Sequence, residues 1–235
     1  MELRRKAFSM LNLFKEKPQA AKLLIWDWNG TLLDDAAVCV EAMNVVLERR
    51  NMSRLDPDFY ASVFTFPVSV YYQALGFDFS VEPFETPAME FMDQYISRVN
   101  KAPLRTNTIE TLGHFKSLGF RQIVLSAMEH ELLIELLDHH RIGSFFDHIA
   151  GISNHLGHGK TDQGIHLMRQ GIIDPESSVL IGDTLHDLEV AAKLGCRCIL
   201  FPSGHQSAER LQAAINSHNN AFFAENLTAL RQLLH

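Results

Sequence analysis

Residues 23–32 read LLIWDWNGTL, an apolar run that changes into acidic, small and polar residues at Asp27, Asn29, Gly30 and Thr31. A short apolar run of this kind favours a buried strand, and the glycine-containing segment after it indicates a turn. Residues 178–187, SVLIGDTLHD, have the same form. The two stretches therefore predict strands that each end in a carboxylate.

The pattern of the two stretches continues along the chain. Apolar runs predict strands over residues 23–28, 122–127, 148–151, 178–183 and 196–202, and residues 221–224 add a predicted edge strand. Three- and four-residue apolar spacing predicts helices over residues 108–118, 129–139, 160–169, 186–194, 206–215 and 227–234. Strands that alternate with helices form a parallel sheet. We therefore predict an α/β fold with a Rossmann-like, doubly wound parallel sheet.

The interval between the first two predicted strands is too long for one crossover helix. Helical spacing over residues 37–50, 68–75 and 87–99, separated by Gly76, Pro83 and Pro87, indicates an inserted all-helical cap. We predict a cap over residues 37–103, a core over residues 23–36 and 104–235, and a basic N-terminal extension over residues 1–22.

Composition excludes several classes of protein. The formal net charge of -7 provides no electrostatic footprint for nucleic acid. No apolar stretch approaches the roughly 20 residues that span a bilayer. The N-terminal segment lacks a signal-peptide pattern, so a cytoplasmic location is expected. Cys39, Cys196 and Cys198 lack metal-ligand spacing and are expected to be reduced, buried thiols.

The residues that follow the predicted strands carry the chemistry, because ligands of open parallel sheets bind beyond the carboxyl ends of the strands. Asp27, Ser126, Lys160, Asp183 and Asp187 lie at these ends. Carboxylate and carbonyl oxygens suit Mg²⁺, and a lysine with backbone N–H groups suits phosphoryl oxygens. The sequence thus predicts a site for Mg²⁺ and a phosphoryl group, with Asp27 free to act as a nucleophile.

The strand ends carry four motifs: the segment 27–32, Ser126, Lys160 and the segment 182–187. In this order from Leu23 onward, the four motifs resemble the haloacid dehalogenase superfamily. The insertion after the first motif resembles the helical caps of its phosphoglycolate-phosphatase-like branch. The resemblance implies that Asp27 is the nucleophile, that Thr31 positions the phosphoryl group and the loop, and that Ser126 binds a phosphoryl oxygen. It implies that Lys160 offsets negative charge on the nucleophile and the phosphate.

The resemblance also implies a Mg²⁺ site. Asp183 matches the acidic ligand, and it is joined by Asp27 and by the backbone carbonyl of Asn29. Asp187 is expected to support the metal through water or to hold Lys160. The expected function is Mg²⁺-dependent hydrolysis of a small phosphorylated metabolite; the oligomeric state does not follow from the sequence.

Asn29 departs from the family pattern, because phosphatases of this family place a general acid and base aspartate there. An amide can donate a hydrogen bond but cannot deliver a proton near neutral pH. The expected consequence is slow or substrate-restricted turnover that favours acyl and aryl phosphates. Two alternatives stay open: a phosphate- or partner-binding protein without turnover, and a hydrolase of the superfamily with a different reaction.

Other residues have competing interpretations. His186 is expected to be a surface histidine, with replacement of the missing acid as the alternative. His155 and His158 flank the loop before Lys160, but a third zinc ligand is missing nearby. Asp34 and Asp35 are expected to cap the first helix of the insertion, with a hinge as the alternative.

The aromatic residues of the insertion, among them Phe64, Phe66, Tyr71 and Tyr72, are expected to form the cap's own core rather than to face the substrate. Residues 55–97 contain no Lys or Arg. Because recognition of a second anionic group usually requires a basic residue, the cap is not expected to hold a doubly anionic acid. Arg98, Lys101 and Arg105 at the far edge of the insertion are the exceptions.

Overall fold

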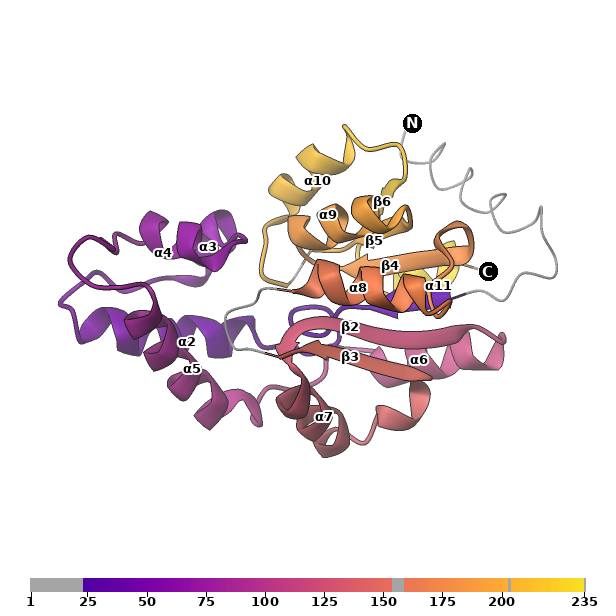
Figure 1. The fold of residues 1–235 in the computed structure, drawn as a ribbon, viewed down its shortest axis with the longest axis horizontal. Coiled ribbons are helices and arrows are strands. Elements are labelled where there is room, and N and C mark those ends of the chain that lie inside the picture. The colour runs from indigo at the N-terminus through magenta and orange to yellow at the C-terminus, as the bar shows by residue number, and fades with distance from the viewer. Residues whose placement is uncertain (1–22, 154–158, 203, 235) are drawn as a thin grey trace.

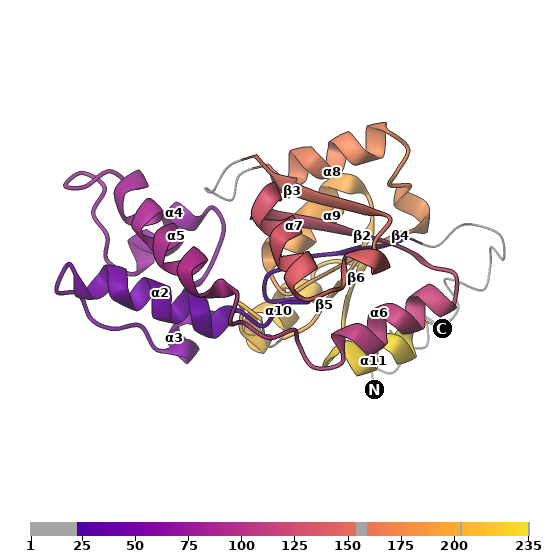
Figure 2. The same cartoon turned by 90° about the horizontal axis from the view of Figure 1, so that it is seen from below.

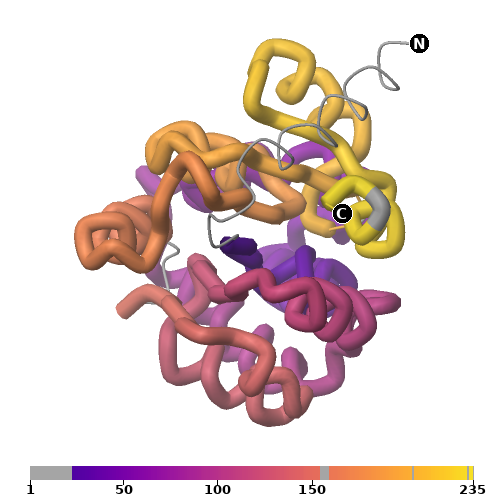
Figure 3. The backbone as a smooth tube through the Cα atoms, turned by 90° about the vertical axis from the view of Figure 1, so that its right-hand side faces the viewer, coloured from indigo at the N-terminus to yellow at the C-terminus, as the bar shows by residue number. Residues whose placement is uncertain are grey.

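The computed structural model describes residues 23–153, 159–202 and 204–234, so the predicted N-terminal extension lies outside the described residues. The strands are β1 (Leu23–Trp26), β2 (Arg121–Glu129), β3 (His148–Ile152), β4 (Ser178–Gly182), β5 (Arg197–Leu200) and β6 (Ala221–Phe223). They form one parallel sheet in the order β3-β2-β1-β4-β5-β6. The predicted doubly wound α/β fold is confirmed, and the first strand lies in the middle of the sheet (Figure 3).

Helices cover both faces of the sheet (Figures 1 and 2). One face carries α6 (Thr108–Ser117), α7 (His130–His139) and α11 (Leu227–Leu233), and the other carries α8 (Lys160–Arg169), α9 (Leu185–Leu194) and α10 (Ala208–Ile215). Short 3-10 turns occur at η1 (Gly143–Phe145) and η2 (Pro175–Ser177).

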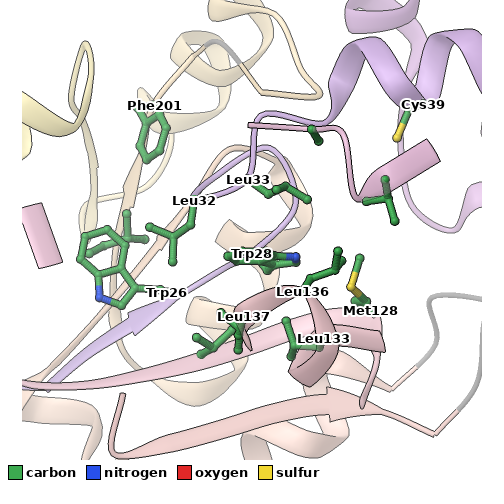
Figure 4. Packing of buried hydrophobic residues seen from close by; sticks show 14 of the residues in the cluster. Trp26, Trp28, Leu32, Leu33, Cys39, Met128, Leu133, Leu136, Leu137 and Phe201 are labelled. Atoms are coloured by element: carbon green, nitrogen blue, oxygen red, sulfur yellow. The ribbon is translucent and has the colours of Figure 1, made fainter. Parts of the chain in front are cut away.

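Strand β1 is apolar throughout because its alternate side chains point to opposite faces of the sheet and both faces are buried. Leu24 and Trp26 pack into one hydrophobic cluster, whereas Leu23 and Ile25 pack into the cluster on the opposite face. Trp26 and Trp28 are fully buried, and Figure 4 shows them among leucines of α7 and of the loop after β1. A strand buried on both faces cannot alternate with polar residues, which is why the sequence shows a continuous apolar run.

The strand ends two residues earlier than the sequence predicts. The N–H groups of Thr31, Leu32 and Leu33 all donate to the carbonyl oxygen of Trp28, so the chain turns sharply there. Asp27 still follows the line of the sheet, because its N–H donates to Ile181 O at 2.9 Å. This hydrogen bond places Asp27 beside the end of β4, where Asp183 follows.

Four helices form a unit at the carboxyl ends of the strands, apart from the sheet (Figure 1). They are α2 (Ala36–Glu48), α3 (Pro57–Val63), α4 (Val68–Ala74) and α5 (Glu85–Val99). The sequence missed α3, which is short and begins at a proline after Asp56, whose carboxylate accepts from the N–H groups of Asp58 and Phe59. We keep residues 37–103 as the predicted limits of this cap.

Candidate active site

Asp27 and Lys160 form the centre of the site. Lys160 begins α8, and its Nζ lies 2.5 Å from Asp27 Oδ1 and 2.5 Å from Asp187 Oδ1. All three side chains are buried. Two carboxylates thus share one ammonium group in a setting where an unpaired charge would be costly.

Thr31 joins the nucleophile candidate to the second acidic strand end. Its Oγ1 lies 3.2 Å from Asp27 Oδ2 and 2.9 Å from Asp183 Oδ1. Asp183 also accepts a 2.6 Å hydrogen bond from the backbone N–H of His205. Thr31 is fully buried and positions two carboxylates.

Gly30 is required by this close packing. Its φ is +70°, and an added Cβ would lie 2.3 Å from Asp183 Oδ2 and 2.6 Å from His205 Cδ2. The left-handed backbone and the missing side chain are both needed for the loop to pass this close to Asp183.

Asp187 is held from both sides. Its Oδ1 is bound by Lys160, and its Oδ2 accepts from Thr184 N at 3.0 Å and from Thr184 Oγ1 at 2.6 Å. Thr184 and Asp187 form a capping box at the start of α9. Of the two expectations for Asp187, the geometry supports the one in which it holds Lys160.

Ser126 is buried in β2 and lines the cavity described below. Its Oγ accepts a 3.0 Å hydrogen bond from Met128 N, which orients the hydroxyl oxygen. The structure thus brings Asp27, Ser126, Lys160 and Asp187 to one cavity wall, with Thr31 and Asp183 behind Asp27.

The charges of the site are unbalanced in the direction that a cation would correct. Burial, together with Asp187 and Asp183, raises the pKa of Asp27 to about 8 against the effect of Lys160. Burial alone would lower the pKa of Lys160, but Asp187 and Asp27 raise it above its usual range. Ligand oxygens of Asp27, Asp183 and Asp187 lie within 4.8 Å of one another. A hard divalent cation fits such an oxygen donor set.

Asn29 is held by a network that the sequence did not reveal. Its Nδ2 donates to Asp35 Oδ2 at 2.7 Å and to Tyr95 Oη at 2.7 Å, and Tyr95 Oη in turn donates to the same Asp35 oxygen at 2.7 Å. Asp35 also accepts from Gly30 N at 2.8 Å. Both N–H groups of the amide are therefore engaged.

The expectation that Asp35 caps the first cap helix is wrong. Asp35 occupies the N-cap position of α2, but its side chain makes no capping hydrogen bond, because it is fully buried and turned toward Asn29, Gly30 and Tyr95. Asp34 remains at the surface, 3.5 Å from Arg105.

His205 completes this network and was missed in the sequence. Its Nε2 lies 3.4 Å from Asp35 Oδ1, and its Nδ1 lies 2.7 Å from Tyr60 Oη of the cap. Burial alone would lower the pKa of His205, but Asp35 and Asp183 raise it to about 9, and the pKa of Asp35 is lowered to about 2. His205 follows β5, so the rule that ligand-site residues follow strand ends could have found it.

A cavity of about 170 Å³ lies between the core residues above and the cap. Its cap side carries the aromatic wall, by which we mean Phe64, Phe66, Tyr71, Tyr72, Phe84 and Phe91. The prediction that Tyr71 and Tyr72 belong to the hydrophobic core is confirmed, and the same two rings also line the cavity. A small cap with one layer of helices uses the same rings for both purposes.

The other candidates are placed as follows. His186 lines the cavity, its side chain is only 18% exposed, and its ring stacks on Phe66 with 4.7 Å between centroids, so the expectation of a surface histidine is wrong. The cap covers it. Arg105 Nη2 donates to Gly30 O at 2.7 Å, and Arg98 bonds within α5. His155 and His158 lie outside the described residues.

Comparison with known proteins decides the family. The model of the haloacid dehalogenase-like hydrolase family matches residues 24–201. The chain belongs to this family. The predicted resemblance, including the phosphoglycolate-phosphatase-like branch, is confirmed, and the chain is a haloacid dehalogenase-like hydrolase.

Relatives of this haloacid dehalogenase-like hydrolase include proteins named as phosphatases and proteins named as kinases. A phosphoglycolate phosphatase of Aquifex aeolicus is 25% identical over 78% of this chain and 86% of the relative. The tyrosine-protein kinase PtkA of Mycobacterium tuberculosis is 26% identical over 83% of this chain and 65% of the relative.

Solved structures show the same fold. A haloacid dehalogenase-like family protein from Streptococcus pneumoniae has a TM-score of 0.71 at 19% identity, covering 90% of this chain and 98% of the other. The structure of PtkA has a TM-score of 0.76 at 24% identity, covering 92% of this chain and 99% of the other.

Within the part of the chain that the structure describes, none of the helices has the length and apolar character to cross a membrane.

Proposed function

We propose that this hydrolase removes the phosphoryl group from a small phosphorylated metabolite, with Mg²⁺ as cofactor and Asp27 as the nucleophile. The contact of Lys160 Nζ with Asp27 Oδ1 and Asp187 Oδ1 carries the proposal. It supplies a fixed positive charge beside a carboxylate at the cavity wall, where charge develops in phosphoryl transfer. A cytoplasmic location is part of the proposal.

Asp27, Asp183 and the backbone carbonyl of Asn29 would hold Mg²⁺. When bound, the ion neutralises charge on the phosphoryl oxygens and orients them for in-line attack. Asp27 and Asp183 offer carboxylate oxygens at this point, and Thr31 Oγ1 contacts both of them. Asp187 would act through Lys160, whose Nζ contacts its Oδ1.

The residues would act in two steps. A carboxylate oxygen of Asp27 attacks phosphorus, the bond to the leaving oxygen breaks, and the leaving group departs with the electron pair. Lys160 and Ser126 hold phosphoryl oxygens. Water then attacks the phosphorus of the aspartyl-phosphate. The phosphorus–oxygen bond to Asp27 breaks, Asp27 leaves as a carboxylate, one proton of the water passes to solvent, and inorganic phosphate carries the other.

Asn29 limits this reaction. Because its amide cannot donate a proton to the leaving oxygen, poor leaving groups are expected to react about 10²–10⁴-fold more slowly than with an acid at this position. The hydrogen bonds to Asp35 and Tyr95 hold the amide in place. Acyl and aryl phosphates, which need little protonation, are the favoured substrates.

Phosphate release from acetyl phosphate and phenyl phosphate tests the proposal. We expect Mg²⁺-dependent turnover in the wild type, its abolition by chelation with EDTA, and its loss in Asp27→Asn. Asp34→Asn is the matched control, because Asp34 lies on the same loop but is half-exposed and does not line the cavity. Equal activity of the two variants would contradict the role of Asp27.

Asn29→Asp tests whether the missing acid at position 29 is the reason for slow or absent turnover. We expect the new carboxyl group to take the place of the amide beside Asp35, where the neighbouring negative charge raises its pKa and favours the protonated form. Turnover of ethyl phosphate should then rise by more than turnover of phenyl phosphate. A silent wild type with an active Asn29→Asp would show that the scaffold is intact and that the natural protein is a phosphate- or partner-binding protein or has another reaction.

A further inference from the structure

The aromatic wall provides a surface suited to another ring. Phe64 meets Tyr71 edge-on at 5.3 Å between centroids, and Tyr72 meets Phe84 in the same way at 5.4 Å. Rings that pack on one another are fixed in position, and an added ring gains contact through its faces and edges. The wall lies opposite Asp27 and Ser126 across one cavity.

The size of the cavity limits what it can hold. Its volume of about 170 Å³ is close to that of the engineered ~150 Å³ apolar cavity that binds benzene. Because Asp27, Ser126 and Lys160 line the same space, it must also take the phosphoryl group, which leaves less room for a fused ring system or a nucleotide than for a single ring.

The charge of the cavity disfavours a second anionic group on the substrate. Among the described residues that line the cavity, Lys160 is the only lysine or arginine, and it is bound to Asp27 and Asp187. His205 also lines the cavity, but its two ring nitrogens already contact Asp35 and Tyr60. A carboxylate on the leaving group would therefore have to compete with these protein groups for a cation.

The chemistry of Asn29 leads to the same class of substrate by an independent route. A phenolic oxygen has a pKa near 10, far below that of an alkyl alcohol, so it can depart as an anion without a proton from the protein. The phosphorus–oxygen bond breaks as Asp27 attacks, the aryl oxygen keeps the electron pair, and solvent later protonates it.

We propose that the substrate of this site is a small aryl phosphomonoester with one uncharged aromatic ring, which the aromatic wall holds while Asp27 takes the phosphoryl group. The proposal rests on the proposed function for its chemistry. The wall and the charge of the cavity supply its specificity.

Binding to Asp27→Asn in the presence of Mg²⁺ is the test, because this variant separates affinity from turnover. Calorimetry would compare phenyl phosphate, ethyl phosphate and phosphoglycolate. We expect phenyl phosphate to bind at least about tenfold more tightly than ethyl phosphate, because the ring buries more apolar surface. Phosphoglycolate should bind most weakly.

Two variants in the Asp27→Asn background sharpen the result. Phe91→Ala removes a ring of the wall and should weaken phenyl phosphate about tenfold or more while leaving ethyl phosphate within about twofold. Phe79→Ala is the matched control, since Phe79 is also a partly buried ring of the cap but does not line the cavity. Met92→Arg should weaken phenyl phosphate and tighten phosphoglycolate, because it places a cation at the cavity.

Equal affinity for phenyl and ethyl phosphate, or equal effects of Phe91→Ala and Phe79→Ala, would overturn the proposal. Turnover of acetyl phosphate through Asp27 with no preference for the ring would overturn it while the proposed function stands. Absence of both binding and turnover for every compound would overturn the two together.

Discussion

The two sides of the cavity are built on different principles. The core side consists of charged and hydroxyl side chains near strand ends, and the charged ones are held by two or more hydrogen bonds or ion pairs, as Lys160 and Asp187 are. The cap side consists of aromatic rings from α4, α5 and the segment after α3, held by ring-to-ring packing. In the proposed function the two sides have different tasks: the core side would supply the charge for the chemistry, and the cap side would select the shape and polarity of the substrate.

The two sides meet at the Asp35 network. Tyr60 of the cap reaches His205 of the core, and Tyr95 of the cap reaches Asp35 and Asn29. Hydrogen bonds between buried groups depend strongly on geometry, so this contact couples the position of the cap to the loop that carries Asp27.

The largest expected effect is a loss of kcat when the central cation of the core side is removed. Lys160→Met leaves Asp27 and Asp187 without their shared cation, and we expect kcat for phenyl phosphate to fall by about 10²–10³-fold or more, as it does when one preorganised electrostatic donor is removed. Steady-state kinetics at saturating Mg²⁺ measures the change. Lys193→Met, at an exposed position of α9, is the control. A decrease below tenfold for Lys160→Met would show that the core side does not supply the charge.

An intermediate effect is expected where the two sides meet. Tyr60→Phe removes the hydroxyl that contacts His205 Nδ1, and we expect a loss of about 1.5–3 kcal/mol in the free energy of unfolding, the range for hydrogen bonds to charged groups. Tyr71→Phe is the matched control. Tyr71 is also a buried cap tyrosine, but its hydroxyl has no hydrogen-bond partner among the described residues, so the change should be near zero. Urea denaturation compares them, and equal losses would contradict the role of the contact.

The last expected effect is a pH dependence of stability. The pKa of His205 is raised from 6.5 to about 9, so its contribution is fully present below pH 6.5 and is lost as pH rises through 9. The pKa of Asp35 is lowered from 3.8 to about 2, so its contribution is present above pH 3.8 and is lost as pH falls through 2. We expect Tm to fall between pH 6.5 and 9 in the wild type and to change less in His205→Gln.

Thermal melts at pH 5.5, 7.5 and 9 would measure this dependence, with His218→Gln at an exposed position as the control. A decrease of the same size in His205→Gln would assign the pH dependence to other groups.

Sequence patterns predicted the strands of the sheet, the helices that alternate with these strands along the chain, and the polar residues on the core side of the cavity. A strand buried on both faces must be apolar along its length, and the strand ends of a parallel sheet meet at one edge, so Asp27, Ser126, Lys160 and Asp187 could be placed together from their positions in the chain. The predicted helix bounds 160–169 agree with those of α8, since the three- and four-residue apolar spacing of this segment is that of a helix.

Only the tertiary structure decided the roles of Asp35, His205 and the aromatic wall. Asp35 has the spacing of a helix cap, and nothing in that spacing shows that its carboxylate turns toward Asn29 and His205 instead. The same limit applies to Phe64 or Tyr71, because an aromatic residue that packs in a core and one that lines a cavity have the same local pattern. The directions of such side chains depend on contacts between segments far apart in the chain, and those contacts exist only after the cap has packed against the sheet.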